Sequence, residues 1–187
     1  MSEISERYRR VSDQFAERVK AVPDDAWTNP APPEGWDARA VVRHLVDWLP
    51  GFFSQWPIEV RPAPSVDDDP LAAWTAVDDA LQGGLDDPAI AGAVLDSLPM
   101  GPMSYEAALD MICTPDVLAH TWDLARAAGL DETLDPAEVA RQVAGMEAMP
   151  PELEQSMRDS GHYGPRVPVP ADADAQTRLI AFLGREP

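Results

Sequence analysis

Three side chains able to bind a metal lie in two strongly helical stretches of the sequence. One stretch, residues 115–124, contains Asp116 and His120, and the other, residues 41–48, contains His44. In a helix, residues i and i+4 leave the same face one turn apart, so Asp116 and His120 could hold one ion between them. If the two helices pack together, His44 would complete a site of two imidazoles and one carboxylate.

Imidazole and carboxylate are good ligands for borderline divalent ions, and three protein ligands leave coordination positions for water or substrate. An open site of this kind is typical of catalysis. The spacing also has a simpler interpretation, because Asp and His four residues apart often form an ordinary ion pair on a helix surface. His44 alone could be a partly buried helix residue, and His162 is expected to be a loop residue in solvent.

Cys113 is the single cysteine of the chain, which excludes an internal disulfide and a cysteine-based zinc cluster. It could face the same pocket as Asp116 if the helix is continuous, but a small buried apolar residue is the favoured interpretation. The acidic run 67–69 lacks the spacing of an EF-hand loop and is interpreted as a helix cap with solvated charge. Four tryptophans are expected first of all in the core: Trp36, Trp48, Trp74 and Trp122.

Composition restricts the function classes. The 187 residues fit one domain over 1–187. A net charge of -19 opposes binding to phosphate backbones or anionic lipid, so neither nucleic acid nor a membrane is expected as a partner. The N-terminus shows no export signal, and no run of about 18 apolar residues is present. These features predict a cytoplasmic protein.

Apolar periodicity and capping residues predict an all-α chain. Four long helices are expected to begin near Ile4, Asp37, Pro70 and Ser104. The second should kink or break at Pro50-Gly51, the third should run to Gly83-Gly84, and the fourth should stop at Gly129. At Pro115 two outcomes stay open: one kinked helix, or a new helix capped by Thr114.

The remainder of the chain is expected to hold short helices and an extended tail. A helical turn followed by loop is predicted after Pro88, and a further helix is predicted to start at Asp135-Pro136. Shorter helical segments are expected near 153–157 and 173–184. The proline-rich tail 161–170 should lie extended over the bundle.

Several stretches resemble a known family. Residues 33–45, which contain Gly35-Trp36 and His44, resemble the Gly-Trp, then histidine, signature of the DinB-like metalloprotein superfamily. Residues 116–129 resemble its second metal motif in the branch of the mycothiol-dependent maleylpyruvate isomerase. Residues 164–170 and 178–185 resemble the end of the smaller uncharacterised members of that branch.

The resemblance implies a DinB/YfiT-like four-helix bundle whose divalent ion, zinc or nickel, is held by His44, Asp116 and His120. Members of the superfamily commonly use the ion to deprotonate a low-molecular-weight thiol and transfer it. Asp116 stands where the isomerase has a longer glutamate, and the isomerase has a further C-terminal domain, so maleylpyruvate isomerisation itself is not expected here.

The leading expectation is therefore a metal-dependent thiol transferase or isomerase. Its partners would be a mycothiol-like thiol and an electrophilic small molecule, and a homodimer is left open. Two alternatives remain, a metallohydrolase that uses the same ion and a non-catalytic dimeric metal-binding module. No residue decides between thiolate and hydroxide as the nucleophile.

Overall fold

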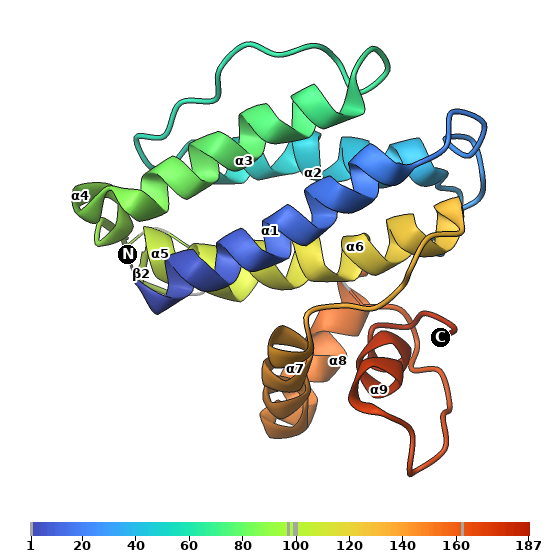
Figure 1. Cartoon of the computed structure of the whole chain (residues 1–187). Helices are drawn as coiled ribbons and strands as arrows, with labels where there is room; N and C mark the ends of the chain where they lie inside the picture. The colour runs from blue at the N-terminus through green and yellow to red at the C-terminus, as the bar shows by residue number, and fades with distance from the viewer. Residues whose placement is uncertain (1, 97, 99–100, 162) are drawn as a thin grey trace. The chain divides into compact units, whose positions relative to one another are not determined.

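The computed structural model describes residues 2–96, 98, 101–161 and 163–187, so the prediction for His162 lies outside the described residues. These residues form two compact units, Met1–Glu132 and Thr133–Pro187. The all-α class is confirmed (Figure 1). The single-domain organisation stays a prediction, as does the DinB/YfiT-like four-helix bundle.

The first unit contains most of the regular structure. Its elements are α1 (Glu3–Ala21), α2 (Ala38–Phe53), α3 (Pro70–Asp86), α4 (Pro88–Ala91), β1 (Val94–Leu95), β2 (Met103–Ser104), α5 (Tyr105–Ala108), the π-helix η1 (Leu109–Cys113) and α6 (Thr114–Ala128). The long helices α1, α2, α3 and α6 lie side by side, and each packs against two of the others (Figure 1). α1 contacts α3 and α6, and α2 contacts the same two helices.

Residues at helical spacing fill the space between these helices. On α1 the fully buried residues include Tyr8, Val11 and Phe15, and Phe15 meets Trp74 of α3 edge to face with ring centroids 4.8 Å apart. On α2 the buried stripe includes Leu45 and Leu49. Burial of apolar side chains from four amphipathic helices is what holds the unit together.

The predicted helix starts are confirmed by the capping contacts. Asp37 accepts a hydrogen bond from the Ala40 N–H at 2.7 Å, and Asp69 accepts one from the Ala72 N–H at 2.9 Å. Ser104 caps α5 in the same way. Each cap satisfies an N–H group that a helix start otherwise leaves without a partner.

The helix bounds differ from the predictions at two places. α2 does not break at Pro50, because the helix continues to Phe53 and the Ser54 N–H donates to the Pro50 carbonyl at 2.8 Å; the other predicted alternative, a kink, stays a prediction. α3 does not stop at Gly83-Gly84 but runs on to Asp86. Gly84 has a packing role, since a Cβ there would lie 2.6 Å from Cζ of Tyr105.

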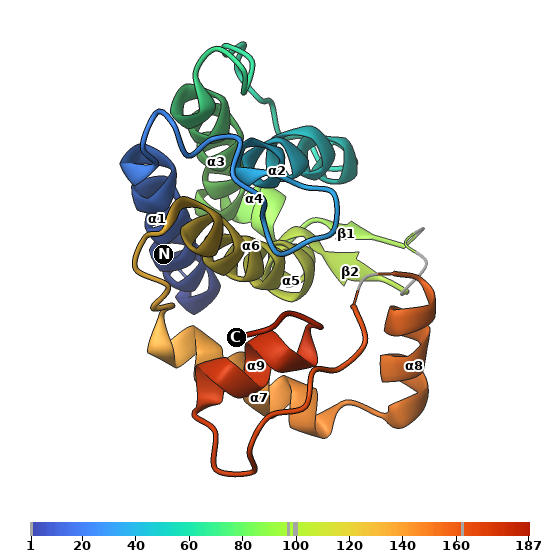
Figure 2. The same cartoon turned by 90° about the vertical axis from the view of Figure 1, so that its right-hand side faces the viewer.

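The segment after α4 also differs from the predicted loop. β1 and β2 form a short antiparallel ladder, with Val94 opposite Ser104 and Leu95 opposite Met103 (Figure 2). Each strand has two residues, too few for an alternation of apolar and polar residues, so the sequence pattern could not predict these strands. Among the described residues this two-stranded ladder is the sheet of the structure.

The second unit consists of α7 (Pro136–Ala148), α8 (Pro151–Asp159) and α9 (Ala175–Phe182). Asp135 caps α7 as predicted, and α7 packs against α9. The extended tail runs beside α9, where the Val167 N–H donates to the Ala181 carbonyl at 3.0 Å. Its predicted position over the bundle stays a prediction.

Across the described parts of both units, no helix combines the length and the apolar character needed to cross a membrane.

Candidate metal centre

His44 comes from the flank of α2. Val41 and Leu45 are fully buried on the core side of this helix, so the neighbouring position 44 lies at the edge of the core, with 32% of its side chain exposed. The start of the helix is held by two backbone hydrogen bonds to the preceding loop, from Ala38 to Asn29 and from Arg39 to Trp27. These contacts fix the rotation of α2 and with it the direction of the imidazole.

Asp116 and His120 come from the first two turns of α6, one helical turn apart. Of the two alternatives predicted at Pro115, the structure agrees with the single helix, because the chain stays helical through η1, where the Thr114 N–H donates to the Leu109 carbonyl. Thr114 is not the N-cap of a new helix, and a kink at Pro115 stays a prediction. A π-turn widens the helix by one residue, and this lets the chain pass Pro115, which has no N–H to donate. Gly129, with a φ of 67°, then ends the helix as predicted.

The structure brings the three predicted ligands together. One ligand atom from each of His44, Asp116 and His120 lies within 4.8 Å of the others. Nε2 of His44 is 3.5 Å from Oδ2 of Asp116, and Nε2 of His120 is 3.4 Å from Oδ1. Ligands of a tetrahedral ion with bonds of about 2.0 to 2.1 Å are about 3.3 to 3.4 Å apart, so the two separations between imidazole and carboxylate suit a divalent ion.

The same contacts change the acid strength of the groups. Burial disfavours the ionised form of Asp116, but the charges and hydrogen bonds of His120 and His44 outweigh burial and hold the pKa of this carboxyl well below its usual range. Burial also disfavours the charged form of His120, but Asp116 and Asp123 outweigh it and raise the pKa of this imidazole above its usual value. Without an ion, the pair is stable as a carboxylate beside an imidazolium.

Asp123 is a site residue that the sequence analysis missed. Its side chain is fully buried, and Oδ2 lies 2.9 Å from Nδ1 of His120. A carboxylate that accepts the Nδ1–H of a histidine leaves Nε2 free to bind an ion and fixes the plane of the ring. The signal was present in the sequence, because Asp123 follows His120 by three residues and shares its helix face.

Trp36 and Trp48 were expected in the core, but both are half-buried at the edge of the site. The Trp36 ring lies 4.9 Å from the His44 ring and stacks on the His120 ring at 5.6 Å, between ring centroids. Gly35, with a φ of 78°, makes the turn that places Trp36 there. Trp48 donates its indole N–H to Oδ2 of Asp116 at 3.1 Å. Trp74 and Trp122 are buried as predicted.

Cys113 is fully buried and is not a member of the His44, Asp116 and His120 group. Burial, helped by the negative charges of Asp116 and Asp78, raises the pKa of the thiol well above its usual value. A thiol in this state is a poor nucleophile and a poor ligand. The packing interpretation of Cys113 therefore fits the structure better than a pocket role.

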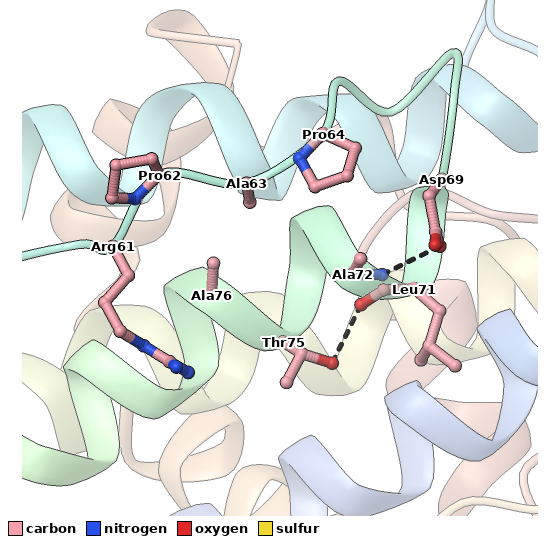
Figure 3. A pocket seen from close by; sticks show the side chains of 9 residues that line it. All are labelled: Arg61, Pro62, Ala63, Pro64, Asp69, Leu71, Ala72, Thr75 and Ala76. Carbon is pink, nitrogen blue, oxygen red and sulfur yellow. Dashed lines mark hydrogen bonds between the residues drawn. The ribbon is translucent and has the colours of Figure 1, made fainter.

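A pocket of about 390 Å³ lies elsewhere in the first unit, between α3 and the proline-rich connection that precedes it (Figure 3). Its polar side chains already have partners. Asp69 accepts from the Ala72 N–H, Thr75 donates to the Leu71 carbonyl at 2.8 Å, and Arg61 pairs with Asp79. None of the three metal-site residues lines it, so it adds nothing to the candidate centre.

Comparisons with known proteins find relatives without an assigned activity. No family model and no solved structure matches the chain. The chain is 29% identical over 184 residues to two proteins of Mycobacterium tuberculosis, each matched over 95% of both chains. They are the uncharacterised protein MT0763 of strain CDC 1551 / Oshkosh and the uncharacterised protein Rv0738 of strain ATCC 25618 / H37Rv. The similarity covers nearly the whole chain, including the region of the candidate site, and carries no function with it.

Proposed function

We propose that this protein is a divalent-metal-dependent enzyme that uses a low-molecular-weight thiol as nucleophile in a thiol transfer or isomerisation. The observation that carries the proposal is the convergence of two imidazoles and one carboxylate from α2 and α6, at separations that suit one ion. The resemblance of residues 33–45 and 116–129 to the DinB-like metal motifs supports the same three ligands.

The donor set favours zinc or nickel. Imidazole nitrogen suits both ions, and calcium or magnesium would require more oxygen ligands than this group offers. The group has three members among the described residues, so it leaves at least one coordination position for a ligand from solution. When bound, such an ion is a Lewis acid that favours the thiolate form of a thiol at neutral pH.

The nucleophile is proposed to come from outside the protein. Trp36, Trp48 and Asp123 contact the three ligands, and none of them is a suitable covalent nucleophile, because indole rings are not and the Asp123 carboxylate is fully buried. Cys113 is fully buried. A small thiol starts from a pKa near 8.5 whereas water starts from 15.7, so a thiol needs much less activation, and its soft sulfur suits zinc or nickel.

The residues of the site then have different roles. His120 is held by Asp123 and presents Nε2, while His44 and Asp116, which are 32% and 27% exposed, form the side that a thiol can approach. The thiol is proposed to be of the mycothiol type, in line with the resemblance to the mycothiol-dependent branch. The second substrate is an electrophilic small molecule.

The test begins with metal analysis of protein purified without added ions. Wild-type protein should contain close to one zinc or nickel per chain, and His120→Ala should lose it. A matched control is Asp47→Ala, which removes an exposed carboxylate on α2 outside the three-member group and should keep the metal.

Cobalt-substituted protein is then titrated with a mycothiol-type thiol. A change in the visible spectrum and a thiol-dependent turnover of model electrophiles, abolished by Asp116→Ala, are the expected results. Hydrolysis by the metal-loaded protein without thiol would favour the metallohydrolase instead. Metal binding without a response to any thiol or substrate would favour the non-catalytic module.

A further inference from the structure

Trp48 is the aromatic residue that joins the two helices of the candidate site through a hydrogen bond. It follows His44 by one turn on α2, and its indole N–H donates across to Oδ2 of Asp116 on α6 at 3.1 Å. The Trp48 and His44 rings are neighbours, with centroids 5.9 Å apart. An indole nitrogen donates but does not coordinate, so any effect of this N–H on a bound ion has to act through Asp116.

The two oxygens of Asp116 have different surroundings. Oδ2 accepts the indole N–H and lies 3.5 Å from Nε2 of His44, whereas Oδ1 lies 3.4 Å from Nε2 of His120. The indole N–H takes one of the two acceptor sites of Oδ2, whereas among the described residues no indole contacts Oδ1, which faces His120. It also restricts rotation of the carboxylate about its last side-chain bond, which in a free aspartate is soft.

We propose that Trp48 is a positioning residue of the metal site, whose indole N–H holds Asp116 by Oδ2 and so favours Oδ1 as the oxygen that binds the ion. This inference rests on the proposed function, since it requires that the three-member group binds a metal. Its consequence concerns the remaining coordination positions. A carboxylate that is free to rotate can bind through both oxygens and take a position that the thiol needs.

The test compares two variants that each keep an aromatic ring. Trp48→Phe removes the donor to Asp116 and keeps a ring beside His44. Trp36→Phe is the matched control, because Trp36 contacts both imidazoles as a ring, at 4.9 and 5.6 Å. For each variant and for wild type, zinc affinity is measured by competition with a chelator, and the visible spectrum of the cobalt-substituted protein is recorded with and without thiol.

Trp48→Phe should weaken zinc binding roughly 10- to 100-fold, the usual effect of removing a group that orients a metal ligand. Its cobalt spectrum should become weaker, as expected when coordination number rises, and its response to thiol should fall. Trp36→Phe should change affinity by less than about threefold and keep the wild-type spectrum. Equal losses in both variants, or a wild-type affinity and spectrum in Trp48→Phe, would overturn the inference.

A separate measurement keeps this result apart from a failure of the proposed function. The indole N–H signal of Trp48 is followed by NMR in metal-free wild type and in Asp116→Asn. A shift of that signal supports the contact on which the inference stands. If wild type binds no metal at all, the proposed function fails and the positioning role fails with it. If wild type binds metal but the indole N–H signal has the same chemical shift in wild type and in Asp116→Asn, the positioning role alone is overturned.

Discussion

Replacing Asp78 by asparagine should stabilise the protein, and the gain should increase with pH. Asp78 lies half-buried on α3 and accepts a hydrogen bond from the hydroxyl of Tyr8 at 2.8 Å. Burial raises the pKa of this carboxyl from its ordinary 3.8 to about 6, against the hydrogen bonds from Tyr8 and Ser12 that favour the ionised form. The charges of Asp13 and Asp79 raise it further.

The sign of the effect follows from proton binding. The folded protein binds the proton of Asp78 more tightly than the unfolded chain, so the stability from protonation is fully present below about pH 4 and is lost as pH rises through about 6. At 1.36 kcal/mol for each pH unit, the difference between 3.8 and about 6 corresponds to about 3 kcal/mol of lost stability above neutral pH. At pH 5 the same relation gives a smaller loss, about 2 kcal/mol.

The assay is urea unfolding of wild type and Asp78→Asn between pH 5 and pH 8.5. This range lies above the isoelectric point near 4.2, and so avoids the pH at which the uncharged protein would tend to associate. The variant keeps an oxygen to accept the Tyr8 hydroxyl but carries no charge. It should be more stable by about 2 kcal/mol at pH 5 and about 3 kcal/mol at pH 8.5.

The matched control is Asp25→Asn in the exposed loop after α1, which should change stability by less than about 0.5 kcal/mol at either pH. Destabilisation of Asp78→Asn at every pH, or a difference from wild type that does not change with pH, would refute the reasoning.

Three further outcomes follow from the packing and the site. Gly84→Ala should destabilise the protein by about 1 to 3 kcal/mol in urea unfolding, because the new methyl would lie 2.6 Å from the buried Tyr105 ring. Gly83→Ala, with open space around its Cβ, should be neutral or stabilising in the same assay, and equal effects of the two variants would contradict the packing argument. Asp123→Asn should weaken zinc binding about 10- to 100-fold in a chelator competition, since it loosens the ring of His120, and an unchanged affinity would contradict that role. Zinc affinity should fall as pH drops, because a proton competes with zinc for His120. Asp116 and Asp123 outweigh burial and raise the pKa of this histidine, so the zinc affinity measured between pH 6 and 9 should still increase above pH 7. An affinity that does not change with pH would exclude His120 as a ligand.

Helix starts could be predicted from the sequence because their signals are local. Asp37, Asp69 and Ser104 each precede a helix by one residue, and each cap contact involves a backbone N–H only three residues away. Helix ends and interruptions were less predictable. Gly84 resembles a stop signal until its neighbour Tyr105, distant in sequence, is known to fill the space above it.

The candidate site was predictable in part for a related reason. The i, i+4 spacing of Asp116 and His120 determines that they share a helix face, but it does not say which helix packs opposite. The position of His44 beside them depends on the pairing of α2 with α6, for which the family resemblance supplied the expectation. The indole hydrogen bond of Trp48 depends on the same pairing of α2 with α6, so no local sequence pattern predicts it.

The charge of the site gives a reason why a divalent ion suits it better than a single proton. Asp116 and Asp123 bring two negative charges to His120, and Asp123 is fully buried. Negative charge in a protein interior is expensive unless positive charge lies close to it. One proton on His120 adds a single positive charge beside these two carboxylates, whereas a divalent ion with neutral imidazoles adds two. Under the proposed function an anionic sulfur then adds one negative charge on the side where His44 and Asp116 are partly exposed, and there water screens it at little cost.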